Sequence, residues 1–212
     1  MSPDELVRVL VAKGVRDARV LDAFRTVPRK SFVPPEEERD AYVDVPVRIP
    51  HEQVTTQPSL MALMVEALEL RGHERVLEVG TGLGFQTAIL ATLSREVVSI
   101  ERFADLAATS RRNLASVGIE NAIVIVGDGS LGVPEHAPYD AIVTAAAAPR
   151  VPPALVEELS EGGRLVHPLG PGGHEVVIAW RKQDGKLVTE RDITLAYFVP
   201  MVGAFGAHED RR

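Results

Sequence analysis

Cysteine is absent from this 212-residue chain, which excludes a disulfide framework, a thiolate metal site, an iron–sulfur cluster and a catalytic thiol. Basic residues are scarce as well: 23 Lys and Arg stand against 30 Asp and Glu, and a net charge of −7 disfavours a nucleic-acid-binding surface. No apolar run approaches the roughly 20 residues of a membrane-spanning helix. The first residues, MSPDELVRVLVAKG, carry acids where a secretory signal carries bases, so we expect a cytoplasmic protein.

Several catalytic and metal-binding patterns are also missing. The histidines are at positions 51, 73, 136, 167, 174 and 208. None lies three or four positions from another, so the sequence predicts no metal site. No G-x-S-x-G turn is present, which disfavours a hydrolase, and no G-K-[ST] follows a glycine loop, which excludes a P-loop.

The length predicts one domain, residues 1–212. We expect an N-terminal helical and Pro-rich cap over residues 1–55, a cofactor-binding core over 56–180, and C-terminal strands with a tail over 181–212. Two short helices should precede the Pro-rich stretch 28–50. That stretch is either a linker or a packed cap, and its interleaved apolar residues, such as Phe32 and Tyr42, favour the cap.

Short apolar runs alternate with helical patterns between about residues 75 and 160. Such alternation predicts right-handed βαβ units and a parallel sheet. One of these helices is expected over PPALVEELSE, residues 152–161, with glycines after it. Three strands joined by short turns should follow, with a hairpin at Asp184-Gly185, so the sheet should end in an antiparallel edge.

A glycine-rich turn, Glu78-Val79-Gly80-Thr81-Gly82-Leu83-Gly84-Phe85, follows the first predicted strand of this core. A dinucleotide fingerprint would require a small residue at Phe85, and a carboxylate at Glu78 would repel a pyrophosphate. The same carboxylate suits a cationic, phosphate-free ligand. The turn therefore favours S-adenosylmethionine over NAD.

Two more acids end the next predicted strands. Glu101 ends VVSIE and could accept hydrogen bonds from ribose hydroxyls, and Asp128 in Gly127-Asp128-Gly129 could accept from an adenine amine. Each acid alone could equally be a solvated residue at a strand end. Ligands of open α/β sheets bind at strand carboxyl ends, which favours a joint site.

The segment Gln53-Val54-Thr55-Thr56-Gln57-Pro58 precedes a predicted helix. Its hydroxyls and free backbone N–H groups could bind an anion at the helix N-terminus. The same residues could simply cap the helix, and the segment alone leaves both interpretations open.

Several segments together carry a resemblance over nearly the whole chain: PRKSFVP, AYVDVP, QVTTQP, VLEVGTGLGF, GDGSLGVPEHAPYDAIVTAAAAPRVPPAL, GGRLVHPLG and FVPMVG. With them the chain resembles the protein-L-isoaspartate (D-aspartate) O-methyltransferase family. The resemblance implies an α/β fold of the class I S-adenosylmethionine-dependent methyltransferase (Rossmann-like) type. It implies a seven-stranded, mostly parallel sheet with helices on both faces and an antiparallel C-terminal edge.

The resemblance also implies an activity: methyl transfer from S-adenosyl-L-methionine to the α-carboxylate of L-isoaspartyl residues in damaged proteins and peptides, with S-adenosyl-L-homocysteine as product. The family's motif serine falls on Thr56, which keeps the hydroxyl and would orient the acceptor carboxylate. A family threonine falls on Val54, which lacks a hydroxyl. These two departures affect how the substrate is positioned.

Other site residues are implied by the same resemblance. The cofactor-binding set is Gln57, Pro58, Ser59, Leu60, Glu78, Gly80, Thr81, Gly82, Leu83, Gly84, Glu101, Arg102, Asp128 and Gly129. The substrate-binding set is Asp44, Val54, Thr55, Thr56, Val199 and Val202. We expect a monomer without nucleic-acid or membrane partners. Two alternatives are a same-family O-methyltransferase of a dedicated natural-product peptide and a non-catalytic cofactor-binding relative.

Overall fold

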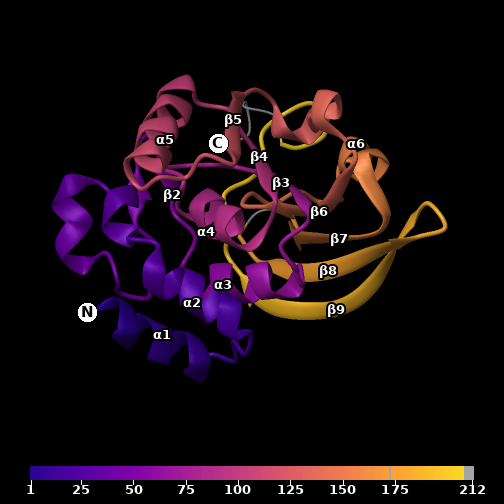
Figure 1. Cartoon of the computed structure of the whole chain (residues 1–212). Helices are drawn as coiled ribbons and strands as arrows, with labels where there is room; N and C mark the ends of the chain where they lie inside the picture. The colour runs from indigo at the N-terminus through magenta and orange to yellow at the C-terminus, as the bar shows by residue number, and fades with distance from the viewer. Residues whose placement is uncertain (172, 208–212) are drawn as a thin grey trace.

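A seven-stranded sheet forms the centre of the computed structural model, which describes residues 1–171 and 173–207 (Figure 1). Its strands are β3 (Arg75–Val79), β4 (Glu96–Glu101), β5 (Ala122–Val126), β6 (Tyr139–Thr144), β7 (Leu159–Leu169), β8 (Glu175–Gln183) and β9 (Lys186–Ala196). They lie in the order β5-β4-β3-β6-β7-β8-β9. Pairing is parallel from β5 to β7 and antiparallel from β7 to β9, which confirms the predicted sheet. Residues 208–212 of the expected tail, with His208, lie outside the described residues.

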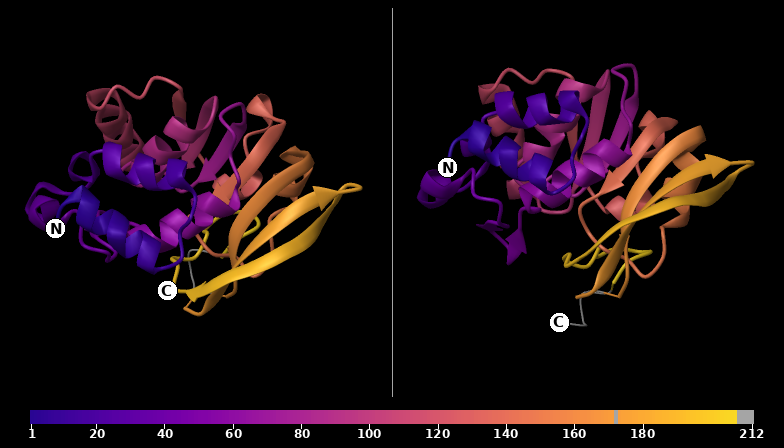
Figure 2. Two further views of the ribbon diagram at one scale, coloured as in Figure 1. Left: turned by 60° about the horizontal axis from the view of Figure 1, so that its bottom comes forward. Right: turned by 90° about the horizontal axis from the view of Figure 1, so that it is seen from below.

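Helices cover both faces of the sheet (Figures 1 and 2). They are α3 (Pro58–Ala67), α4 (Phe85–Leu93), α5 (Ala104–Ser116) and α6 (Pro153–Glu158). Buried side chains alternate along the strands, so that Val76 packs with α3 and α4 whereas Leu77 packs with Leu155 of α6. The central strands β3, β4 and β6 are therefore buried on both faces, which explains their nearly continuous apolar sequences.

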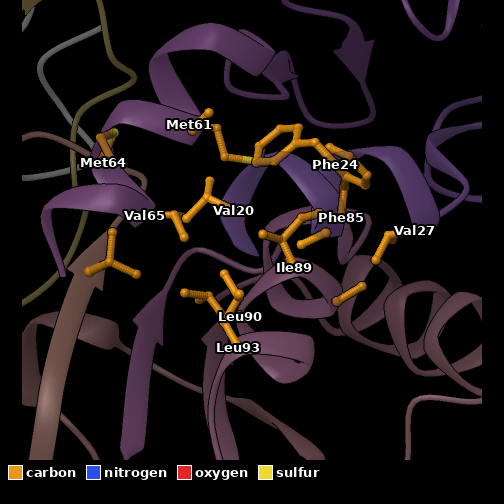
Figure 3. Packing of buried hydrophobic residues seen from close by; sticks show 14 of the residues in the cluster. Val20, Phe24, Val27, Met61, Met64, Val65, Phe85, Ile89, Leu90 and Leu93 are labelled. Atoms are coloured by element: carbon orange, nitrogen blue, oxygen red, sulfur yellow. The ribbon is translucent and has the colours of Figure 1, made fainter. Parts of the chain in front are cut away.

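The N-terminal helices α1 (Pro3–Ala12) and α2 (Ala18–Thr26) share the core of one sheet face. Figure 3 shows side chains of α2, α3 and α4 pointing toward one another. The rings of Phe24 and Phe85 meet edge to face with centroids 5.6 Å apart, and Phe32 packs on Phe85 at 5.8 Å. Phe85, the bulky residue that departs from a dinucleotide fingerprint, therefore anchors the N-terminal segment to α4.

The Pro-rich segment wraps around one buried guanidinium. It forms the 3₁₀ helices η1 (Arg29–Phe32) and η2 (Pro35–Asp40) and a small hairpin of β1 (Arg48–Ile49) and β2 (Gln53–Val54). Arg29 is 1% exposed and donates to the carbonyl oxygens of Ala41, Val43 and Val45 and to Thr55 Oγ1. These hydrogen bonds satisfy backbone acceptors that irregular, proline-interrupted chain cannot pair with itself.

Two boundaries near the C-terminal half are informative. The helix expected over residues 152–161 ends at Glu158, and β7 begins at Leu159, which pairs with Tyr139 of β6. The expectation was wrong there because sheet pairing overrides the helical pattern of a short segment that ends in glycines. The hairpin at Asp184-Gly185 is as predicted, with φ of 50° and 74° as a type I′ turn requires.

Candidate active site

Two cavities lie at the carboxyl ends of β3 and β6, where the strand order reverses. Open α/β sheets bind ligands at such a reversal. The wide cavity, of about 400 Å³, is bordered by α3 and by residues 194–199. The narrow cavity, of about 90 Å³, is bordered by the glycine loop, the end of β4 and residues 199–202. Val54, Ala145 and Val199 line both cavities, so the two meet at these residues.

The glycine loop between β3 and α4 keeps the space between these strand ends open. Gly80, Gly82 and Gly84 have φ of 95°, 55° and 97°, a region that favours glycine. A Cβ on Gly80 would lie 3.3 Å from the Cβ of Ala145, so a side chain would crowd the junction of the cavities. The loop also borders a hollow of about 50 Å³, the glycine-loop cavity, which Thr56 lines as well.

Glu101 lies in the wall of the narrow cavity, and backbone N–H groups hold its carboxylate in place. Its Oε2 accepts a hydrogen bond of 2.8 Å from the Gly82 N–H, and Oε1 accepts one of 3.1 Å from the Phe103 N–H. Each oxygen keeps acceptor capacity for a ligand hydroxyl. Arg102 lines the same cavity, and its guanidinium lies 4.6 Å from the ring centroid of Phe103.

Glu78 is completely buried behind the glycine loop and does not line the cavities of the described chain. Its Oε2 accepts hydrogen bonds from Thr87 Oγ1 and Ser99 Oγ, and Oε1 has no partner in the part of the chain described. Burial raises the pKa of Glu78 to about 7, against the opposing effect of the Ser99 and Thr87 hydroxyls. The glycine-rich motif suggested that Glu78 contacts the cofactor directly. In this structure its carboxylate instead lies behind the loop.

Gln86 is a polar residue of this region that the sequence analysis missed. It lies in the first turn of α4, lines the glycine-loop cavity and is 4% exposed. Neither atom of its amide meets strict hydrogen-bond geometry within the described residues. The amide nevertheless faces the buried Glu78 carboxyl and lowers the pKa of that group, so the two side chains form one polar cluster behind the glycine loop. The available signal was a glutamine within the apolar sequence FQTAILATL.

Asp128 is tied to the C-terminal segment. Its Oδ1 accepts from the N–H and hydroxyl of Ser130, and Oδ2 accepts from the Ala204 N–H at 2.8 Å. Burial opposes ionisation, but these hydrogen bonds hold the pKa of Asp128 below its usual value. Asp128 lines an open hollow beside the narrow cavity together with Arg102 and Val202.

The two threonines before α3 have different surroundings. Thr55 Oγ1 accepts hydrogen bonds from the Val47 N–H at 3.0 Å and from Arg29, so its hydroxyl faces the protein. Thr56 lines both the wide and the glycine-loop cavities, and its hydroxyl has no protein partner in the described ranges. Of these two threonines, Thr56 is therefore the one whose hydroxyl is free within the described residues and faces the cavities.

Capping of α3 is performed by a residue outside the segment. Gln57 occupies the N-cap position without a side-chain capping bond. Asp44 Oδ1 accepts from the Ser59 N–H at 2.8 Å, and Oδ2 accepts from Gln57 Nε2 at 2.9 Å. The capping interpretation of the threonine hydroxyls is therefore wrong, and both Asp44 oxygens already hold the start of α3.

The model of the Protein-L-isoaspartate (D-aspartate) O-methyltransferase family matches residues 1–206. The chain belongs to this family. It is 47% identical over 206 residues to the protein-L-isoaspartate O-methyltransferase of Methanoculleus marisnigri, covering 96% of this chain and 92% of that relative. The corresponding protein of Methanoregula boonei is 46% identical over 197 residues, covering 93% and 90%. The resemblance recognised from the motifs is confirmed.

Solved structures of the family superpose on this chain. One protein-L-isoaspartate O-methyltransferase structure has a TM-score of 0.85 at 31% identity, and the match covers 96% of this chain and 67% of that one. A Plasmodium falciparum member in complex with S-adenosyl-L-homocysteine has a TM-score of 0.80 at 24% identity, covering 94% and 98%. The second likeness shows the shared fold, which is the predicted Rossmann-like class I methyltransferase fold.

The other site residues implied by the resemblance fall into two groups: some line a cavity, and others pack behind the residues that do. Those that line a cavity are Gln57, Ser59, Leu60, Thr81, Leu83, Gly129, Val199 and Val202. Pro58 is buried in the first turn of α3, and Gly84 lies against Ser110 and Leu114.

Across residues 1–171 and 173–207, no helix has the length and apolarity to cross a bilayer. The same ranges contain no cluster of three or more His, Asp or Glu arranged for a metal ion.

Proposed function

We propose that this chain is a repair methyltransferase that uses S-adenosyl-L-methionine to methylate the α-carboxylate of L-isoaspartyl residues in damaged proteins and peptides. The observation that carries the proposal is the position of Thr56, whose unpartnered hydroxyl lies where the wide cavity meets the glycine-loop cavity. One cavity can then take the acceptor and the other the donor. S-adenosyl-L-homocysteine is the second product.

The residues present fit this donor. The carboxylate of Glu101, at the end of β4, offers acceptors to the ribose hydroxyls, and Arg102 lies beside it. Gly129 borders the part of the narrow cavity that we assign to the adenine. Gly80, Thr81, Gly82 and Leu83 leave room for the methionine end, and Gln86, which faces Glu78, lines the same glycine-loop cavity. We assign Gln57, Pro58, Ser59 and Leu60 to the border of the site.

Two assigned residues act indirectly, because Glu78 and Gly84 shape the glycine loop from behind. Asp128 fixes the C-terminal segment that carries Val202, and its Oδ2 keeps acceptor capacity for the adenine amine. Glu78 also supplies negative potential behind a cationic donor when it is ionised.

The acceptor side is built around Thr56. Its hydroxyl donates a hydrogen bond to the isoaspartyl carboxylate and aims one oxygen at the donor methyl. Val54 and Val199 line the passage between the cavities, and Val202 lies beyond it. Thr55 and Asp44 hold the two ends of the segment in place through Arg29 and the start of α3.

The chemistry needs few catalytic groups. When bound, the donor supplies an electrophilic methyl group on a sulfonium. An α-carboxylate has an ordinary pKa of roughly 3.5, so it is ionised near pH 7 and requires no general base. The protein therefore has to align a carboxylate oxygen with the methyl group and exclude water while the O–C bond forms and the S–C bond breaks.

We further propose that residues 1–212 act as one domain, because the cap of residues 1–55 and the sheet contribute to one core cluster. We propose a monomeric, cytoplasmic enzyme with no nucleic-acid partner, in keeping with the net charge of −7. The expected 56–180 core and the 181–212 strands then form one unit with the cap.

A methylation assay with an isoaspartyl peptide and its aspartyl twin tests the proposal. We expect methyl ester on the isoaspartyl peptide alone. Cofactor binding without transfer to either peptide would leave a non-catalytic relative, and transfer only to one unrelated peptide sequence would indicate a dedicated peptide methyltransferase.

A further inference from the structure

The wide cavity has an unusual charge for this chain. Among the described residues that line it, Lys13 is the only one with a charged side chain, and no acid is among them. The chain as a whole carries a net charge of −7. A peptide that enters this cavity therefore meets a local positive charge on an otherwise acidic protein.

Lys13 is free to bind an incoming anion. It is the C-cap residue of α1, where its backbone N–H bonds to carbonyl oxygens of the last turn. Its ammonium group has no hydrogen bond or ion pair in the part of the chain that the structure describes, and the residue is exposed. Lys182 differs, because its Nζ donates to the carbonyl oxygens of Val156 and Leu159 and is already satisfied.

The wall of the wide cavity formed by residues 194–199 is apolar and open. Leu195 is 75% exposed and Tyr197 is 70% exposed, although both are large side chains. The Tyr197 ring lies 4.7 Å from the His174 ring, which limits its motion. A peptide lying on this wall would displace water beside the ammonium group, and less water strengthens a charge interaction.

We propose that Lys13 selects isoaspartyl peptides that carry an acidic residue beside the damaged site. The proposal rests on the proposed function, because it assigns the wide cavity to the residues that flank the isoaspartate. Thr56, at the junction with the glycine-loop cavity, holds the reacting carboxylate, and Lys13 contacts a neighbouring residue. An exposed ion pair of this kind changes affinity roughly two- to fivefold and weakens as salt is added.

Three capped peptides test this proposal. They contain one isoaspartyl residue and differ only in their flanking residues, which are Glu, Gln or Lys. We expect kcat/KM for methyl transfer to fall in that order at low ionic strength, by roughly two- to fivefold at each step. Lys13→Gln should bring the three values together, and Lys13→Glu should reverse the order.

Lys186→Gln is the matched control. Lys186 begins β9 at the hairpin that projects away from α1 in Figures 1 and 2, whereas Leu195 near the other end of the strand lines the wide cavity. This variant should keep the wild-type order, and all variants should keep the wild-type cofactor Kd. Equal kcat/KM for the three peptides with wild-type enzyme, or the same loss for all three in Lys13→Gln, would overturn the proposal. No transfer to any isoaspartyl peptide would instead overturn the proposed function.

Discussion

Thr56 contributes one hydroxyl to the proposed reaction, and that hydroxyl can be removed with little change of shape. Thr56→Val keeps the branched side chain but cannot donate to a carboxylate. A hydrogen bond to a charged group is worth about 1.5–3 kcal/mol, so kcat/KM should fall roughly 10- to 150-fold. Isothermal titration should give a nearly unchanged cofactor Kd.

Thr56→Ser is the matched control for this change, because it keeps the hydroxyl and removes only the methyl group. It should stay within a few-fold of wild-type kcat/KM. A Thr56→Val enzyme with wild-type kcat/KM, or one that no longer binds cofactor, would contradict the assigned role.

Glu101 has a role that can be tested by binding alone. Glu101→Ala removes both carboxylate oxygens proposed for the ribose hydroxyls, so cofactor binding should weaken by about 1–3 kcal/mol. Glu96→Ala serves as the control, because Glu96 begins the same strand and forms an ion pair with Arg75 far from the cavity. Equal Kd values for wild type and Glu101→Ala would remove Glu101 from the site.

Residue types and spacing in the sequence point to Glu78 and Glu101, and the family resemblance points to Thr56, but neither indicates which way a side chain faces. Glu78 and Glu101 both accompany strand carboxyl ends, and only Glu101 reaches a cavity. Glu78 instead faces Thr87 and Ser99, which come from α4 and β4. Such contacts depend on how helix and strand pack, and a linear pattern of acids and glycines contains no information about that packing.

The small hairpin of β1 and β2 is the element that closes one side of the narrow cavity. Ile49, Gln53 and Val54 of the hairpin line this cavity. His51 at its tip bonds to the Asp105 carboxylate at 2.8 Å and stacks on Phe103 with ring centroids 4.0 Å apart. The tip is thereby fastened to the start of α5.

His51→Ala should loosen this attachment and weaken cofactor binding by about threefold, mainly through the lost ring stacking. Stopped-flow measurement of product release should show a faster rate. His73→Ala is the control, since the exposed His73 pairs with Glu74 outside the cavities. Unchanged affinity and release in His51→Ala would show that the hairpin does not retain the ligand.

The same hairpin is a structural element that the sequence did not predict. Alternating apolar and helical patterns predicted the sheet and its main helices because those elements are long and strongly periodic. Strands of two residues have no periodicity to read. The turn also lacks glycine, with His51 and Glu52 at φ of 62° and 56°, so the usual hairpin signal was absent.

For the molecule as a whole, two buried groups oppose each other in the dependence of stability on pH. Burial lowers the pKa of His167 from 6.5 to about 4, so its contribution is present above pH 6.5 and is lost as pH falls toward 4. Burial raises the pKa of Glu78 from 4.5 to about 7, so its contribution is present below pH 4.5 and is lost as pH rises toward 7. Between pH 4.5 and 6.5 the two slopes nearly cancel.

In Glu78→Gln, the dependence of the free energy of unfolding on pH should follow the titration of His167 alone. The introduced amide can donate to the hydroxyl oxygens of Thr87 and Ser99, so the fold keeps these contacts. The variant no longer loses stability above pH 4.5, and by pH 8 its free energy of unfolding should exceed the wild-type value by on the order of 3 kcal/mol. Urea denaturation at pH 5, 6.5 and 8 measures this, with Glu96→Gln as an exposed carboxylate control. A difference between Glu78→Gln and wild type that stays constant across these pH values would mean that Glu78 titrates alike in the folded and unfolded chains.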